Sequence, residues 1–255
     1  MKVVLVGSGN VASVLGRMIK RSGHSILRVI SRDAEHARIL ADELECRYGA
    51  IGESFNDHAD LYIIAVKDEA IPTIKDHMHV GSRPVVHTAG SVSKDVLKGI
   101  SSNYGVIYPL QSLRKEVEPS QPVPLLIDGN SAETITLLQD FAKTISPNIA
   151  LAPDKERLKM HVAAVVVSNF TNHLYALAEE YCKKEKVDFK LLAPLIEETA
   201  HRVAHASPAL LQTGPAARKD KHTIEKHLAL LEDHKPLQAI YKMLTESIME
   251  KSAKK

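Results

Sequence analysis

The stretch VVLVGSGNVASVLGRMI, residues 3–19, constrains the fold of this chain more than any other part of the sequence. An apolar run typical of a buried strand leads into a glycine turn and then into a helical pattern. Gly7, Gly9 and Ala12 match the spacing GxGxxG/A, which permits a tight turn, close approach of a pyrophosphate and close packing of helix on strand. The helix N-terminus adds free N–H groups and a partial positive charge. The stretch therefore predicts a βαβ unit that binds a dinucleotide through Gly7, Ser8, Gly9, Asn10 and Val11.

Strand patterns alternate with helical patterns over the first 150 residues. This order is typical of an α/β Rossmann fold, with a doubly wound and mostly parallel sheet. The expected strands are KVVLV (2–6), SILRVIS (25–31), LYIIAV (61–66), PVVHTA (84–89), YGVIYP (104–109) and PLLID (124–128).

Only helical patterns follow Asp154, which stands with Pro153 at a credible helix start. The expected helices span about residues 154–186, 188–206, 221–232 and 235–251. We therefore predict a Rossmann-like domain over residues 1–152 and an all-α C-terminal domain over residues 153–255. Two loops are rich in proline or glycine, RKEVEPSQPVP and SPALLQTGPAARKD, and loops of this length are often functional.

The end of the second expected strand bears on the choice between NAD and NADP. An acidic residue there binds the ribose 2′-hydroxyl of NAD, whereas an arginine suits the 2′-phosphate of NADP. Ser31 and Arg32 stand at this position, and Asp33 is better placed to cap the next helix. The sequence therefore favours NADP, with a plain surface charge as the alternative interpretation of Arg32.

The later strand ends should border the same crevice, because open α/β sheets bind ligands at the carboxyl ends of their strands. The residues expected there are Ala65, Val66, Lys67, His87, Thr88, Ala89 and Gly90. Lys67 could instead be a surface lysine, and His87 could merely bond a neighbouring carbonyl. Tyr108 and Gln111 follow the sixth strand and are candidates for substrate contact, although a tyrosine at a strand end is often a packing residue.

Composition excludes several classes of protein. The net charge is only +2 and aromatic residues make up 4%, so nucleic-acid binding has little support. No stretch approaches the roughly 20 apolar residues that span a bilayer. The two cysteines cannot form a disulfide framework and lack metal-ligand spacing, which fits a reducing cytoplasm. We expect a cytoplasmic protein with neither a membrane nor a nucleic-acid partner.

Several motifs together resemble a known family. The stretches are GSGNVA, AVKD, HTAGS, YPLQSL, SNFTNHLYALAEE and TGPAARKD. In this order they resemble the bacterial NADP oxidoreductases that join a Rossmann-like domain to a C-terminal helical domain of unknown function. GSGNVA and AVKD are more distantly similar to pyrroline-5-carboxylate reductase, within the 6-phosphogluconate dehydrogenase-like superfamily. The resemblance implies an NADP domain, an all-α domain and a homodimer formed through the C-terminal helices, but it names no substrate.

The chain departs from one part of that wider superfamily. The β-hydroxyacid dehydrogenases carry a catalytic lysine on the first long interdomain helix and an asparagine four residues later. Here the lysine is Lys159 and the residue four positions on is Ala163. That catalytic pair is therefore not expected in this chain, and Lys159 is interpreted as a surface residue.

The segment HVAAVVVSNFTNHLY, residues 161–175, is typical of a buried helix, yet it carries the polar side chains of His161, Ser168, Asn169, Asn172 and His173. At about 100° per residue, His161, Ser168 and Asn172 fall on one ridge with Asn169 beside it. Such a ridge can be a buried structural network or the lining of a pocket. If the helix crosses the nucleotide crevice, as the resemblance implies, the ridge faces the nicotinamide. His161 is then the candidate general acid, and Asn169, Asn172 and Ser168 would orient the substrate.

The stretch TGPAARKD offers a second set of candidates for substrate contact. Gly214 and Pro215 predict a turn, Asp220 a helix cap, and Arg218 a fork of donors for a carboxylate or phosphate. Thr213 precedes the turn. The alternative is a structural connector in which Arg218 pairs with an acidic surface residue.

Glu197, His201 and His205 share one helical face, but thirteen histidines make such spacing a frequent coincidence. We expect no metal site. The sequence as a whole predicts an NADP-dependent oxidoreductase that transfers hydride between NADPH and a small carbonyl, imine or hydroxy acid in the interdomain cleft. The alternative is a catalytically silent NADP-binding sensor or scaffold, which the missing lysine and asparagine pair would explain.

Overall fold

The computed structural model describes residues 1–53 and 58–252. Their contacts form two compact units, Met1–Ser168 and Asn169–Lys255. The division between these units falls inside the helical part of the chain, beyond the predicted domain boundary at residue 152. That boundary stays a prediction.

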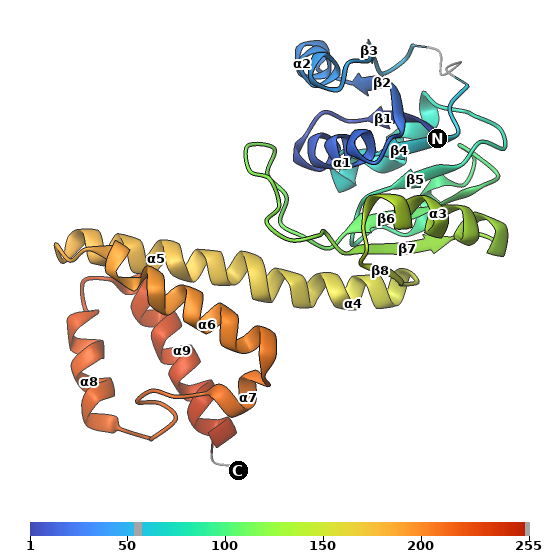
Figure 1. The fold of residues 1–255 in the computed structure, drawn as a ribbon. Coiled ribbons are helices and arrows are strands. Elements are labelled where there is room, and N and C mark those ends of the chain that lie inside the picture. The colour runs from blue at the N-terminus through green and yellow to red at the C-terminus, as the bar shows by residue number, and fades with distance from the viewer. Residues whose placement is uncertain (54–57, 253–255) are drawn as a thin grey trace. The chain divides into compact units, whose positions relative to one another are not determined.

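The first unit is built on a sheet whose eight described strands have the order β3-β2-β1-β4-β5-β6-β7-β8 (Figure 1). The strands are β1 (Lys2–Val6), β2 (Ser25–Ser31), β3 (Arg47–Ala50), β4 (Leu61–Ile64), β5 (Val85–His87), β6 (Tyr104–Pro109), β7 (Leu125–Gly129) and β8 (Ile149–Leu151). All neighbouring pairs are parallel except β6 and β7. The predicted Rossmann fold with a mostly parallel sheet is confirmed.

Both faces of this sheet are buried, as its apolar strands require. Along β1, Val3 and Leu5 join one apolar cluster while Val4 and Val6 join the other, which reflects the two-residue period of a strand. The first cluster is completed by α1 (Asn10–Arg21), α2 (Ala34–Leu44) and α3 (Ala132–Ile145). The second is completed by the 3₁₀ segments η1 (Asp68–Asp76) and η2 (Lys94–Leu97).

Two short strands, β3 and β8, were not predicted. The sequence of β3 is RYGA, in which an arginine and a glycine hide the strand pattern, and within the described residues β2 is its one paired strand. β8 is three residues long, too short for a periodic signal. The direction of β7 also has a simple cause. Residues 110–124 contain no crossover helix to return the chain to the opposite end of the sheet, so β7 runs antiparallel to β6.

The predicted helices after Asp154 are confirmed, with finer divisions. They are α4 (Asp154–Ala164), the π-helical segment η3 (Val165–Phe170), α5 (Thr171–Lys184), η4 (Phe189–Leu192), α6 (Ala193–His205), α8 (Lys221–Leu230) and α9 (Lys235–Ser252). A short helix, α7 (Pro208–Leu211), lies in the loop that was expected to have little regular structure. Within the described residues, no helix is long and apolar enough to cross a membrane.

The expectation that residues 161–175 form a buried helix is wrong for the single chain. Val162, Val167 and Phe170 have 58%, 72% and 58% of their surface exposed. Apolar residues stand all around this segment rather than on one face, so packing on one neighbour leaves many of them in solvent. The segment therefore keeps a large apolar surface outside the core.

Candidate functional site

A pocket of about 800 Å³ lies where β1, β2 and β4 end, at the carboxyl edge of the parallel strands. This is the edge where open α/β sheets bind their ligands. The residues that line it are Gly7, Ser8, Gly9, Ser31, Arg32, Asp33, Ala34, His36, Ile51, Ala65, Val66 and Lys67. Eight of these residues were predicted cofactor contacts, and the structure brings them together in one concave surface.

The two glycines of the loop have different roles. Gly7 has φ +125°, and a Cβ there would stand 2.1 Å from the carbonyl oxygen of Ala65. Gly7 N–H also donates to the Ile30 carbonyl at 2.7 Å, which fixes the turn against β2. Gly9 is the N-cap of α1, and a Cβ there would meet nothing within 4 Å. The loop thus offers the bare backbone and helix N-terminus that fit a pyrophosphate.

The end of β2 has the chemistry that NADP requires. The Ser8 hydroxyl donates to Ser31 Oγ at 3.0 Å and joins the glycine loop to the strand end. Arg32 is exposed and lines the pocket, and a guanidinium is a suitable donor for a phosphate. Asp33 accepts from His36 N–H at 2.9 Å, so its predicted role as the cap of α2 is confirmed.

The pocket also contains side chains that were not predicted to line it. Asp33, Ala34 and His36 come from the first turn of α2, and Ile51 comes directly after β3. The predicted start of a helix after Arg32 could have indicated Asp33, Ala34 and His36, because the first turn of that helix lies beside the strand end. The signal for Ile51 was missing because β3 itself was not recognised.

Two predicted contacts, Asn10 and Val11, begin α1 but do not line this pocket. Asn10 Oδ1 instead accepts the backbone N–H of Lys115 at 3.2 Å. The proline-rich loop after β6 is held on α1 at two further points. Arg17 donates to the Lys115 carbonyl at 2.7 Å, and Arg21 forms an ion pair with Glu118.

At the end of β5, the side chain of His87 is wholly buried and both of its ring nitrogens are used. Nε2 lies 3.3 Å from the Ser93 carbonyl, and Nδ1 accepts the N–H of Ala89 at 3.1 Å. Burial is the main cause that lowers the pKa of His87 to about 4, and the positive charge of Arg157 adds to it. The ring of His87 is therefore neutral, and its hydrogen bonds support the loop after β5. This agrees with the alternative interpretation, in which His87 bonds a neighbouring carbonyl. Thr88 is also buried.

Gly90 comes next on this loop and lies against two predicted candidates. A Cβ on Gly90 would stand 2.7 Å from His161 Nδ1 and 2.9 Å from Tyr108 Cζ. Tyr108 Oη lies 2.9 Å from His161 Nδ1, and the two rings meet edge to face with centroids 5.8 Å apart. The end of β6, the loop after β5 and α4 thus meet at the half-buried, hydrogen-bonded pair of Tyr108 and His161.

The protonation state of Tyr108 depends on its surroundings. Burial raises the pKa of this tyrosine, and the negative charge of Asp68 raises it further, against the opposite effect of Arg157. The hydroxyl therefore keeps its proton near neutral pH and can donate to the Nδ1 lone pair of a neutral His161 ring. When His161 is protonated, Nδ1–H donates to the Tyr108 oxygen instead, and the tyrosine proton becomes available to a third group.

The predicted ridge on the helix assumed an uninterrupted α-helix. Ser168 and Asn169 lie in the π-helical segment η3, whose i→i+5 bonds rotate the later residues away from their α-helical positions. His161 and Ser168 belong to the first unit, whereas Asn169 and Asn172 belong to the second and are exposed. Their role in catalysis stays a prediction.

The other substrate candidates belong to different units of the chain. Gln111 is exposed, and its side-chain oxygen accepts the N–H of Ser112. Thr213, Gly214 and Arg218 lie in the second unit, where Gly214 has φ +100° as its predicted turn requires. Asp220 accepts from Thr223 N–H at 3.1 Å and caps α8 as predicted. Among the described residues, no group of three or more His, Cys, Asp or Glu side chains could hold a metal ion.

Comparisons with known families agree with this arrangement. Residues 2–86 match the family described as NADP oxidoreductase coenzyme F420-dependent, and residues 123–248 match a domain of unknown function, DUF2520. No curated protein matches the chain.

Three solved structures are informative. A protein from Bacteroides fragilis described as a "putative NADP oxidoreductase" is 38% identical, with 98% of each chain covered and a TM-score of 0.88. Pyrroline-5-carboxylate reductase from Streptococcus pyogenes is 18% identical, covers 99% of this chain and 98% of its own, and has a TM-score of 0.64. An imine reductase from Myxococcus stipitatus in complex with NADP⁺ is 15% identical, with 98% and 93% covered and a TM-score of 0.65.

The last two similarities show a shared fold alone, whereas the first extends to the sequence over nearly the whole chain. The glycine loop and the arginine at the end of β2 line one pocket, and their role in binding the cofactor stays a prediction. The chain belongs to the family of bacterial NADP oxidoreductases that combine this Rossmann domain with a DUF2520 domain.

Proposed function

We propose that this protein reduces a small carbonyl or imine, or oxidises the corresponding hydroxy acid or amine, with NADP as the hydride carrier. The observation that supports this most strongly is the pair of Tyr108 and His161, which meet at 2.9 Å beside Gly90. Hydride transfer requires a group that supplies or removes one proton at the substrate heteroatom. A tyrosine backed by a histidine provides that group.

The residues of the first unit would each have a distinct task. Gly7, Gly9 and the N-terminus of α1 hold the pyrophosphate, and Arg32 holds the 2′-phosphate. When bound, NADPH supplies the hydride. Tyr108 Oη–H gives its proton to the oxygen or nitrogen of the substrate, and His161 Nδ1–H passes a proton to the tyrosine oxygen. The Tyr108 oxygen is thus reprotonated, and His161 is left neutral until solvent recharges it. Substrate contact with the helical domain stays a prediction.

The substrate class can be found by screening cyclic imines, α-keto acids and semialdehydes and measuring the loss of NADPH absorbance with each. We expect turnover with at least one of these classes. Tight NADPH binding with no turnover in a broad screen would contradict the proposal and would favour a sensor without chemistry.

Cofactor preference should depend on Arg32. Replacing it with aspartate removes a donor to the 2′-phosphate and adds a repelling charge, so NADPH affinity should fall about 10- to 100-fold, as expected for one charged hydrogen bond. Isothermal titration of NADPH and NADH measures both affinities. Lys98→Asp is the control, because Lys98 is exposed and lies outside the pocket. Equal affinity of the unmodified protein for NADH and NADPH would contradict this role of Arg32.

We also propose that the helices mediate a homodimer. Val162, Val167 and Phe170 each leave more than half of their surface in solvent. Leu191 and Leu195, which are 78% and 63% exposed, add to the apolar surface of the helical unit. A second copy of the chain offers the same apolar surface, and symmetric burial of such surfaces is the commonest form of oligomer.

Introducing a charge into this surface should therefore separate the dimer. We expect Val167→Asp to convert a dimer to a monomer at micromolar concentration, as measured by light scattering after gel filtration. Ile39→Asp is the matched control, because Ile39 is 53% exposed but lies on α2. A monomeric unmodified protein, or a dimer that tolerates Val167→Asp, would contradict a dimer formed through the helices.

A further inference from the structure

The first turns of α4 form hydrogen bonds with the loop that follows β5. Asp154, Arg157 and His161 are spaced by three and four residues, so their side chains lie on one face of α4. The first two contact residues 92–94, and the third meets Gly90 and Tyr108. One face of α4 therefore contacts this loop at two places. One of these places is the pair of His161 and Tyr108, which is proposed to supply the proton.

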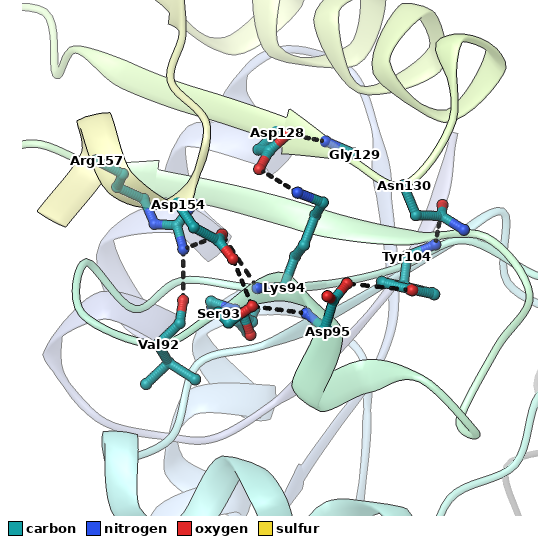
Figure 2. A network of polar contacts seen from close by, with 11 residues as sticks. Val92, Ser93, Lys94, Asp95, Tyr104, Asp128, Gly129, Asn130, Asp154 and Arg157 are labelled. Carbon is teal, nitrogen blue, oxygen red and sulfur yellow. Dashed lines mark hydrogen bonds and ion pairs between the residues drawn. The ribbon is translucent and has the colours of Figure 1, made fainter.

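The contacts at the start of α4 form a closed network (Figure 2). The Ser93 hydroxyl and the Lys94 N–H both donate to the Asp154 carboxylate, the latter at 3.2 Å. Arg157 Nη2 donates to the Val92 carbonyl and, at 2.8 Å, to Asp154 Oδ1. We call the interaction of Asp154 and Arg157 with residues 92–94 the α4 latch.

A second ion pair anchors the loop to the sheet. Lys94 Nζ lies 2.8 Å from Asp128 Oδ2, and the Asp128 side chain on β7 is only 8% exposed. Hydrogen bonding and attraction to Asp128 outweigh the effect of burial and raise the pKa of Lys94. The latch therefore holds α4 against a loop that is itself fixed to the sheet (Figure 2).

Stability alone does not account for the latch. The Arg157 side chain is 1% exposed, and its Nε and Nη1 atoms have no hydrogen-bond partner within the described part of the chain. Burial of a charged group with unsatisfied donors costs free energy, and apolar residues of similar volume often serve stability better. What an arginine provides here is a fixed contact between α4 and the Val92 carbonyl.

We propose that Asp154 and Arg157 are positioning residues, which set the place of α4 on the loop after β5 so that His161 meets Tyr108. The reason is geometric. Gly90 leaves no room for a side chain between the loop and the pair, so a small movement of α4 would break the 2.9 Å contact. This inference rests on the proposed function for its catalytic meaning, but the position of His161 can be measured without a substrate.

The test is the ring nitrogen spectrum of His161 in protein labelled with ¹⁵N-histidine, assigned through the loss of its signals in His161→Gln. Tyr108→Phe gives the Nδ1 resonance of the ring without its partner. We expect Arg157→Met to move the Nδ1 resonance of His161 to that same position. Lys159→Met is the control, because Lys159 is exposed and lies on another face of α4, and it should leave the resonance unchanged.

Two milder variants cover the case in which Arg157→Met does not fold. Asp154→Asn removes the counter-charge of Arg157 at nearly constant shape. Ser93→Ala, at an exposed position, removes the hydroxyl that donates to Asp154 and that also accepts the Asp95 N–H. Both should move the His161 resonance in the same direction by a smaller amount. An unchanged resonance in the folded variants would overturn the proposal.

Kinetics separate this inference from the proposed function. With a substrate in hand, Arg157→Met should lower kcat while the Kd of NADPH changes less than about 3-fold, since none of the residues of the latch lines the pocket at the glycine loop. Arg157→Lys keeps the charge and should recover part of kcat. If the unmodified protein turned over nothing, the proposed function would fail, and the histidine spectrum would still decide whether the latch positions His161.

Discussion

His161→Ala is expected to lower kcat by about 10²- to 10⁴-fold, the usual contribution of a positioned proton donor. The Kd of NADPH should change little, because the pocket proposed to bind the phosphates is formed by the ends of β1, β2 and β4 and is not lined by His161. Stopped-flow measurement of NADPH oxidation, together with titration of the cofactor, gives both quantities. An equal loss of kcat and of NADPH affinity would point to a structural role for His161.

Variants of Tyr108, the hydrogen-bond partner of His161, test the same proton transfer more sharply. If Tyr108 and His161 act as one relay, then Tyr108→Phe alone and the double variant should both lose about as much as His161→Ala. Tyr104→Phe is the matched control, because Tyr104 lies at the other end of the same strand and its hydroxyl contacts Asp95. Losses that simply multiplied in the double variant would mean that the two residues act independently.

Gly7→Ala is expected to destabilise the first unit by about 2 to 5 kcal/mol and to abolish NADPH binding. The backbone at Gly7 has φ +125°, and a Cβ would lie 2.1 Å from the Ala65 carbonyl oxygen. That oxygen is backbone at the end of β4 and cannot rotate away. Urea unfolding followed by circular dichroism measures the stability, and fluorescence of NADPH measures the binding.

Gly9→Ala separates the two roles of the loop. The backbone at Gly9 has φ −86°, and a Cβ would find open space, so the fold should keep its stability within about 1 kcal/mol. The methyl group would nevertheless occupy the surface that a pyrophosphate must approach. We expect a folded protein with at least about 10-fold weaker NADPH binding. A Gly9→Ala variant that bound NADPH normally would contradict the assignment of this loop.

The fold was predictable where the sequence pattern and the structure have the same period. β1, β2 and β6 are apolar runs with clear ends, and the glycine motif predicts the turn and the helix after β1. β3 and β8 were missed because pairing with a neighbouring strand, and not their own composition, makes them strands.

The candidate site was predictable in its parts but not in its assembly. The strand-end rule found the glycine loop, Arg32 and Lys67, which do line one pocket. His161 and Tyr108 were proposed separately for different reasons, and 53 positions separate them in the chain, so no spacing rule could join them. The predicted ridge with Ser168 and Asn172 assumed a continuous α-helix, because sequence periodicity does not reveal a π-helical segment.

The exposure of residues 161–175 is a second property that the sequence of one chain did not predict. The apolar residues of this segment predicted a buried helix, but the sequence of one chain does not say which surface would cover them. Val167 and Phe170 remain exposed in the single chain. This exposure is the observation on which the proposed dimer rests.

The most direct test of the central claim is a crystal structure with NADPH and a substrate analogue. The proposal predicts that the 2′-phosphate lies at Arg32, that the nicotinamide lies beside Gly90, and that Tyr108 Oη is within about 2.6 to 3.2 Å of the substrate heteroatom. A nicotinamide bound elsewhere, with Tyr108 and His161 out of reach of the substrate, would contradict the proposal.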